Sequence, residues 1–113
     1  MNGRVLPVGY QYAGIASGVK SVEGTRDLAL IASDREATVA GVFTQNLVAA
    51  APVVVCRQRT PTQRGRVVVV NSGNANACTG EQGLTDARAM AAAAAAVVGV
   101  DEDQSLVLST GII

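Results

Sequence analysis

The residues whose types and spacing most readily suggest chemistry lie in a short polar segment, residues 71–79. This segment carries three side-chain amides, Asn71, Asn74 and Asn76, followed by Cys78. A polar loop between a buried strand and a helix N-terminus is a common place for a substrate cleft. Asn side chains also bond their own local backbone in turns, and we favour this simpler interpretation while the cleft stays open as an alternative.

Neither cysteine is predicted to be catalytic. Cys78 would lie one residue before a helix cap, where the helix dipole favours a thiolate, but no partner base is present. Cys56 closes an apolar run and is predicted to be a core residue. Their contexts are unrelated, so we expect no disulfide. The chain has no His and no close cluster of Cys or carboxylates, so we predict no metal site.

Composition excludes several classes of partner. The 113 residues fit a single domain, and the 9 basic and 9 acidic residues give zero formal charge, so we expect no nucleic-acid partner. No apolar run approaches the ~20 residues that cross a bilayer. Residues 1–14 contain no continuous apolar stretch after Arg4, which argues against a secretory signal and for the cytoplasm. A local group of arginines could meet a carboxylate substrate, although a solvated face is the interpretation we favour: Arg57, Arg59, Arg64 and Arg66.

The first half of the chain predicts β-structure. Three short apolar segments, residues 14–19, 28–32 and 38–43, are typical of strands in a meander. Polar residues separate them, and residues 33–36 are expected to form a compact turn. Hairpin connections would follow.

Two unbroken β-branched runs, residues 52–56 and 66–70, predict central strands that are buried on both faces. Runs this short cannot be distinguished from buried helix by periodicity alone. The β-branched content favours strand. A final strand is predicted over residues 105–109, leading into Thr110 and Gly111, after an acidic exposed turn at residues 101–104.

One helix is clearly predicted after the asparagine-rich segment. Thr79 and Gln82 have the spacing of a capping box, and Gly99 is placed to end the helix. Apolar side chains recur between them at helical spacing: Leu84, Ala87, Ala91, Ala94 and Val98. The run of alanines predicts close packing on a sheet. The whole pattern therefore indicates an α/β fold, with a mixed sheet layered with helices.

Five stretches together resemble the N-terminal region of a known family: residues 27–31, 40–46, 51–53, 70–80 and 109–111. Their order, residue types and spacing are similar to those of the ornithine acetyltransferases (glutamate N-acetyltransferases) of arginine biosynthesis. The resemblance extends from about Tyr12 to Ile113. The Asn-Ala-Asn loop followed by Thr-Gly is a specific signature.

The resemblance implies that residues 1–113 are the N-terminal part of a longer domain, before a site of autocatalytic cleavage. Gly111-Ile112-Ile113 brings no polar tail, which we also interpret as a cut within a continuing domain. The implied architecture is the αββα arrangement shared with self-processing aminopeptidases that have an N-terminal Thr or Ser. The implied partner is a C-terminal β chain that begins with a nucleophilic Thr, in an α2β2 assembly.

The implied reaction is acetyl transfer from N2-acetylornithine to glutamate through a covalent acetyl-threonine on that downstream chain. No cofactor is needed, and acetyl-CoA is a possible further acetyl donor. Thr110 and Gly111, in the matching Ser-Thr-Gly motif, would form the oxyanion hole; the nucleophile is not in this chain, which alone should be inactive. Alternatives are a related self-processing amidase or aminopeptidase, with water as the acceptor, and a non-catalytic structural or regulatory domain of the same fold.

Overall fold

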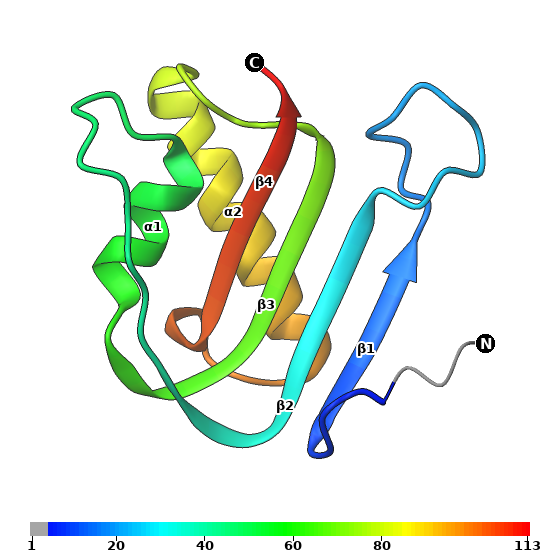
Figure 1. Cartoon of the computed structure of the whole chain (residues 1–113), viewed down its shortest axis with the longest axis vertical. Helices are drawn as coiled ribbons and strands as arrows, with labels where there is room; N and C mark the ends of the chain where they lie inside the picture. The colour runs from blue at the N-terminus through cyan, green and yellow to red at the C-terminus, as the bar shows by residue number, and fades with distance from the viewer. Residues whose placement is uncertain (1–4) are drawn as a thin grey trace.

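The computed structural model describes residues 5–113 and has one mixed sheet with helices packed against it (Figure 1). Residues 1–4, with the Arg4 considered for a secretory signal, lie outside the described part. The elements in chain order are β1 (Tyr10–Ile15), β2 (Leu28–Val39), α1 (Ala51–Arg59), β3 (Thr62–Asn74), α2 (Gly80–Val98), the 3-10 turn η1 (Glu102–Gln104) and β4 (Ser105–Ile112). The predicted α/β class is confirmed.

The strands lie in the order β1-β2-β3-β4. β1 and β3 each pair with β2 antiparallel, whereas β4 pairs with β3 in parallel. A parallel pair needs a crossover connection, and α2 supplies it. The carboxyl ends of β3 and β4 therefore meet at one end of the sheet, and Figure 1 shows the β1–β2 loop at that same end.

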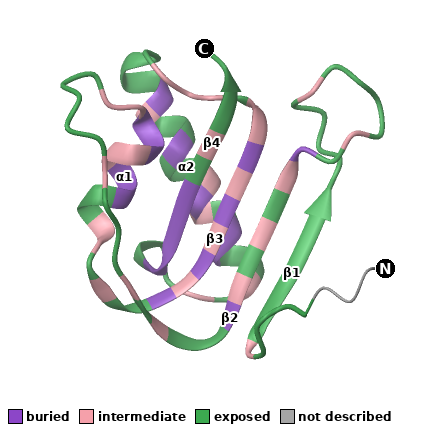
Figure 2. Ribbon diagram, viewed as in Figure 1, coloured by how far each residue is buried: buried purple, intermediate pink, exposed green. Residues whose placement is uncertain are grey.

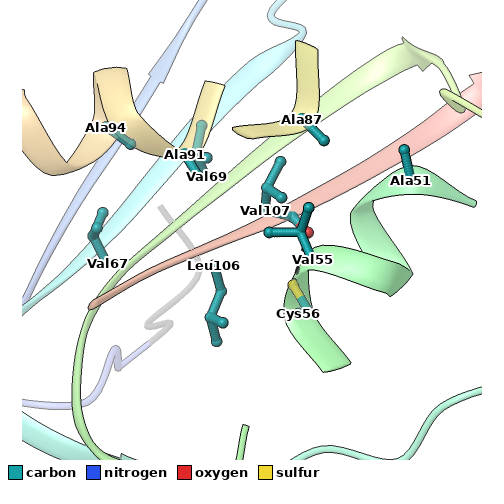
Figure 3. Close-up of a cluster of buried hydrophobic side chains, with 10 residues drawn as sticks. All are labelled: Ala51, Val55, Cys56, Val67, Val69, Ala87, Ala91, Ala94, Leu106 and Val107. Atoms are coloured by element: carbon teal, nitrogen blue, oxygen red, sulfur yellow. Dashed lines mark hydrogen bonds between the residues drawn. The ribbon is translucent and has the colours of Figure 1, made fainter. Parts of the chain in front are cut away.

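Small aliphatic side chains make the core between the sheet and its helices (Figure 3). Val69 of β3 and Val107 of β4 are register partners and face the alanines of α2. Ala91 is fully inaccessible to solvent, at 0 % exposure. Close packing of α2 on the sheet, predicted from the alanine run, is what the burial pattern shows. No helix of residues 5–113 has both the length and the apolar character needed to cross a bilayer.

The ends of α2 agree with the prediction, but its cap does not. Gly99 adopts left-handed geometry, with φ of +79°, and donates its N–H to carbonyls of the last turn. At the other end Thr79 is the N-cap residue but makes no side-chain cap hydrogen bond. Its hydroxyl bonds the Asn76 side chain instead, so the predicted capping box with Gln82 is wrong.

The prediction of a strand over residues 52–56 is wrong, because this run lies in α1. Its buried side chains follow helical spacing: Ala51, Pro52, Val55 and Cys56. Pro52 sits in the first turn, where a missing backbone N–H costs nothing. The β-branched preference for strand is weak, and packing of one side of the run against β4 and α2 outweighs it.

The predicted three-strand meander is also corrected. β1 occupies residues 10–15 rather than 14–19, and the chain continues in β2 through the expected turn at residues 33–36. The pairing of β2 with β3 is irregular there. Ala32 pairs with Val67 and Ala37 with Gly65, so β2 uses more residues than β3 between these two pairs. Polar side chains mark a bulge rather than a reversal. Residues 40–43 of the third expected strand are not in a strand.

Only one face of β3 is buried in residues 5–113 (Figure 2). Val67 and Val69 are buried, but Val68 and Val70 are of intermediate exposure, so burial on both faces was predicted wrongly for this part of the chain. The opposite face carries exposed apolar side chains, among them Tyr12 at 40 %, Ile31 at 38 % and Leu108 at 47 %.

The alanine packing makes a direct prediction for stability. Replacing Ala91 with Leu should lower stability by about 1–3 kcal/mol, because the added methylenes have no space between α2 and the sheet. Ala93→Leu on the exposed side of the same helix is the matched control and should be nearly neutral. Thermal unfolding midpoints of the full-length protein compare the two variants. Equal midpoints would contradict the close packing.

Candidate functional site

Thr110 and Gly111 lie near the exposed carboxyl end of β4. In the parallel register Thr110 pairs with Ser72 and Gly111 with Gly73 of β3. The Ser-Thr-Gly motif and the asparagine-rich motif, which are far apart in the sequence, are therefore on adjacent strands at the same sheet end. That end lies at the surface of residues 5–113, not in the hydrophobic interior.

Gly111 is required because the main chain of β3 lies directly beside it. Its φ of +131° is a conformation that L side chains rarely adopt. A Cβ at this position would lie 2.6 Å from the backbone N of Asn74 and would also overlap Gly73. The main chain of β4 thus approaches β3 more closely than any other residue allows.

The three asparagines bond local backbone, as the favoured interpretation predicts. The amide of Asn71, which is buried in β3 rather than in the expected loop, donates to the Asn74 carbonyl at 2.9 Å. The Asn74 side chain accepts from the Asn76 backbone N–H at 2.8 Å, and the Asn76 amide donates to the Gly83 carbonyl at 2.9 Å. The same side chains line a shallow cavity of about 200 Å³ together with Ser109. The asparagine side chains can therefore both bond local backbone and line a cleft.

Gly83 is a structural residue of this region that the sequence analysis missed. A Cβ there would overlap the Thr79 hydroxyl and lie 2.6 Å from Oδ1 of Asn76. Only glycine lets the asparagine-rich loop fold onto the first turn of α2. An isolated Gly inside a helical pattern was the available signal, but it does not say which segment comes close.

Asp27 was also missed as an individual residue, although it belongs to one of the stretches that carry the family resemblance. It is only 3 % exposed. One carboxylate oxygen accepts from the Ser17 hydroxyl at 2.6 Å and the Ser17 backbone N–H at 2.7 Å, and the other accepts from the Lys20 backbone N–H at 2.9 Å. These hydrogen bonds, led by the Ser17 hydroxyl, hold the pKa of Asp27 well below the usual carboxyl range against the opposing effect of burial.

Residues 11–113 match the ArgJ family. The chain belongs to the ArgJ family. An arginine biosynthesis bifunctional protein ArgJ from Rhodopirellula baltica is 50 % identical over 109 residues, which cover 96 % of this chain and 26 % of that protein. The chain thus spans about a quarter of the length of the curated ArgJ relatives it matches.

Two solved structures share the fold. The ArgJ protein of Bacillus halodurans matches with a TM-score of 0.86 and 39 % identity over 94 % of this chain and 55 % of its own. The ornithine acetyltransferase of Mycobacterium tuberculosis, solved in complex with ornithine, matches with a TM-score of 0.88 and 43 % identity, covering 95 % of this chain and 58 % of its own. The mixed sheet and its helices are therefore the ArgJ arrangement, of which residues 5–113 form part.

The two cysteines of this ArgJ chain have different surroundings. Cys56 is buried, its thiol donates to the Val107 carbonyl at 3.1 Å, and burial raises its pKa because a thiolate would be poorly solvated. Cys78 is exposed in the loop before α2, with φ of +58°. Within residues 5–113 no three His, Cys, Asp or Glu side chains come together as metal ligands do.

The arginines near α1 and β3 do not form one basic face. Arg59 donates to the Ser105 carbonyl at 2.7 Å and pairs with Glu102 at 3.1 Å, so it ties α1 to the start of β4. Arg64 pairs with Asp101 at 2.9 Å, and this hydrogen bond raises the pKa of Arg64. The Arg64 pair is solvent-exposed, and pairs of this kind contribute little to stability. The carboxylate-binding interpretation of this cluster gains no support from its geometry.

Gly111→Ala should destabilise the protein more than Gly99→Ala. Both glycines have positive φ, but only the Cβ of a residue at position 111 would meet backbone atoms, since nothing lies within 4 Å of a Cβ at Gly99. We expect about 1–2 kcal/mol for the strain at position 99 and a larger loss at position 111. Denaturant unfolding of the full-length variants gives both values. A loss at position 111 no larger than at 99 would refute the close approach of β3 and β4.

The lowered pKa of Asp27 predicts a pH dependence of stability. A carboxylate whose folded pKa is depressed stabilises the protein above the unfolded pKa of about 4, and this contribution disappears as the pH falls through the folded value. The difference in unfolding free energy between wild type and Asp27→Asn should be constant above about pH 5 and shrink below pH 4. Urea titrations across this range test it. A difference independent of pH would show that the carboxylate charge is unimportant.

Proposed function

We propose that the protein containing this chain transfers an acetyl group from N2-acetylornithine to glutamate. In this proposal Thr110 and Gly111 form the oxyanion hole, and the nucleophile is a Thr at the start of a second chain. The single observation that carries the assignment is the close pairing of Gly111 with Gly73 at the exposed carboxyl end of β4. Loops at the carboxyl ends of adjacent parallel strands are where α/β proteins commonly bind ligands.

The relatives support this reaction. The Mycobacterium tuberculosis protein is described as an ornithine acetyltransferase in complex with ornithine, and the Rhodopirellula baltica protein as bifunctional in arginine biosynthesis. The match to the family extends over residues 11–113 and so includes the segment that contains Thr110 and Gly111. We extend the proposal to acetyl-CoA as a second acetyl donor, with no bound cofactor.

The chemistry follows from acyl transfer. The Thr hydroxyl of the second chain attacks the acetyl carbonyl carbon, and its proton passes to a base, for which the terminal amine of the same Thr is suited. The carbonyl oxygen becomes anionic, and the Thr110 hydroxyl with the Gly111 N–H would stabilise it. When this intermediate collapses, the C–N bond breaks and ornithine leaves with a proton on its amine. The amine of glutamate then attacks the acetyl-Thr and regenerates the hydroxyl.

The proposed partner is the C-terminal β chain, in an α2β2 assembly. This chain covers 55–58 % of the solved relatives but about a quarter of the curated ones, so the solved chains are roughly half as long, as cleavage into two chains would make them. The exposed apolar face of the sheet, with Ile31 and Leu108, suits a second packed layer of the αββα arrangement. We propose the cytoplasm as the location, although a maize relative, 48 % identical, is described as chloroplastic.

Expression of the full-length protein tests the proposal. Two bands on a denaturing gel and glutamate-dependent ornithine release from N-acetylornithine are expected. Ornithine and acetate release that does not need glutamate would instead favour an amidase. A single band without any acetyl transfer would favour a non-catalytic domain and contradict the proposed reaction.

Thr110→Val tests the role of the hydroxyl. Valine keeps the shape of threonine, so the loss of one donor should lower kcat about 10²–10³-fold while the fold is kept. Thr110→Ser retains the hydroxyl and should recover most of the activity. The extent of cleavage into two chains is measured in parallel, so that turnover is counted per processed molecule. Equal kcat for the Val and Ser variants would refute the oxyanion role.

A further inference from the structure

The β1–β2 loop, residues 16–27, ends in the same cross-strand row as Thr110. Leu28 pairs with Asn71, and one position further the backbone N–H of Ser72 donates to the Asp27 carbonyl at 2.8 Å. Ser72 in turn is the register partner of Thr110. Asp27 just before β2, Ser72 of β3 and Thr110 of β4 therefore lie side by side.

The Asp27 carboxylate closes this loop on itself. It receives three hydrogen bonds, two from Ser17 and one from the backbone of Lys20, while the Asp27 N–H donates to the Ile15 carbonyl at 3.0 Å. A buried carboxylate that accepts several backbone N–H groups fixes their positions, because each donor would be left without a partner if the chain moved. The conformation of residues 17–20 thus depends on one side chain.

The fixed part of the loop lies directly on the end of β3. A Cβ on Gly73 would be 3.0 Å from Cγ of Lys20 and 3.0 Å from Cγ1 of Val19. Gly73 is the register partner of Gly111. Lys20 therefore packs its aliphatic stem one strand away from the proposed oxyanion hole.

Lys20 is the only lysine in the chain, and none of the ion pairs within residues 5–113 involves it. It reaches Asp27 through its backbone N–H, so its ammonium group is not used by that carboxylate. Its side chain is of intermediate exposure. A cation with these properties at the edge of a site is available to an anionic ligand.

We propose that Asp27 is a positioning residue that holds Lys20 beside the acetyl-transfer site, where the ammonium group binds the carboxylate of the N-acetyl amino acid. This inference rests on the proposed function and adds a residue that selects substrates carrying a carboxylate. The role is binding rather than chemistry, since Lys20 would contact the carboxylate of the substrate and not its acetyl group.

The test uses the self-processed full-length enzyme and two acetyl donors. N-acetylornithine carries the carboxylate, whereas N-acetylputrescine is the same acetyl amide without it. Lys20→Met should raise KM for N-acetylornithine on the order of 10- to 100-fold, as loss of a charged hydrogen bond does, with little change in kcat. Its kcat/KM for N-acetylputrescine should equal that of wild type. Arg26→Met removes a positive charge from an exposed position of the same loop and should leave both donors unaffected.

Asp27→Asn, like Lys20→Met, should raise KM for N-acetylornithine. It should also accelerate hydrogen exchange at the Ser17 and Lys20 backbone amides. Asp34→Asn is the matched control, because it makes the same change at an exposed position of β2, the strand that follows Asp27. A Lys20→Met enzyme that keeps the wild-type preference for N-acetylornithine over N-acetylputrescine would overturn the inference while leaving the proposed function intact. Wild type that neither turns over N-acetylornithine nor binds it in calorimetry would overturn both.

Discussion

The close parallel approach of β3 and β4 is the constraint on which the rest of the structure depends. Gly73 faces Gly111 in the register, and a Cβ on Gly111 would overlap the backbone of β3. Two strands that run in the same direction need a long connection, and α2 provides it across one face of the sheet. The alanines of α2 follow from this, since a helix with larger side chains could not lie as near to the valines of β3 and β4.

The sequence predicted those features that depend on local patterns. Gly99 marked the end of α2, and the valine run marked the centre of β3, because both signals act within a few residues. The strand predicted over residues 52–56 was wrong because a short apolar run has no measurable period, and the contacts that decide its structure come from β4 and α2. The turn predicted at residues 33–36 was wrong because polar side chains on an irregular part of a strand resemble those of a turn.

The candidate site shows the same division. Thr110 and Gly111 were found through the resemblance of whole motifs, and no local rule would have assigned them a role. Asp27 and Gly83 act on partners seven or more residues away, Lys20 and Asn76 respectively. Such partners become known only when the loops are placed in space. Residues whose importance lies in a contact that the chain makes only when its loops fold back are therefore the ones that single-sequence reasoning misses.

The opposite surroundings of the two cysteines have a practical consequence for this chain. Cys56 lies on the side of α1 that packs against β4, and burial raises the pKa of its thiol, whereas Cys78 is exposed beside the first turn of α2. Thiolates, not thiols, react with maleimides, so reagents of this type should distinguish the two side chains in the folded state. Cys78 is thereby a natural attachment point for a fluorophore or spin label, close to the loop that borders the β3–β4 end.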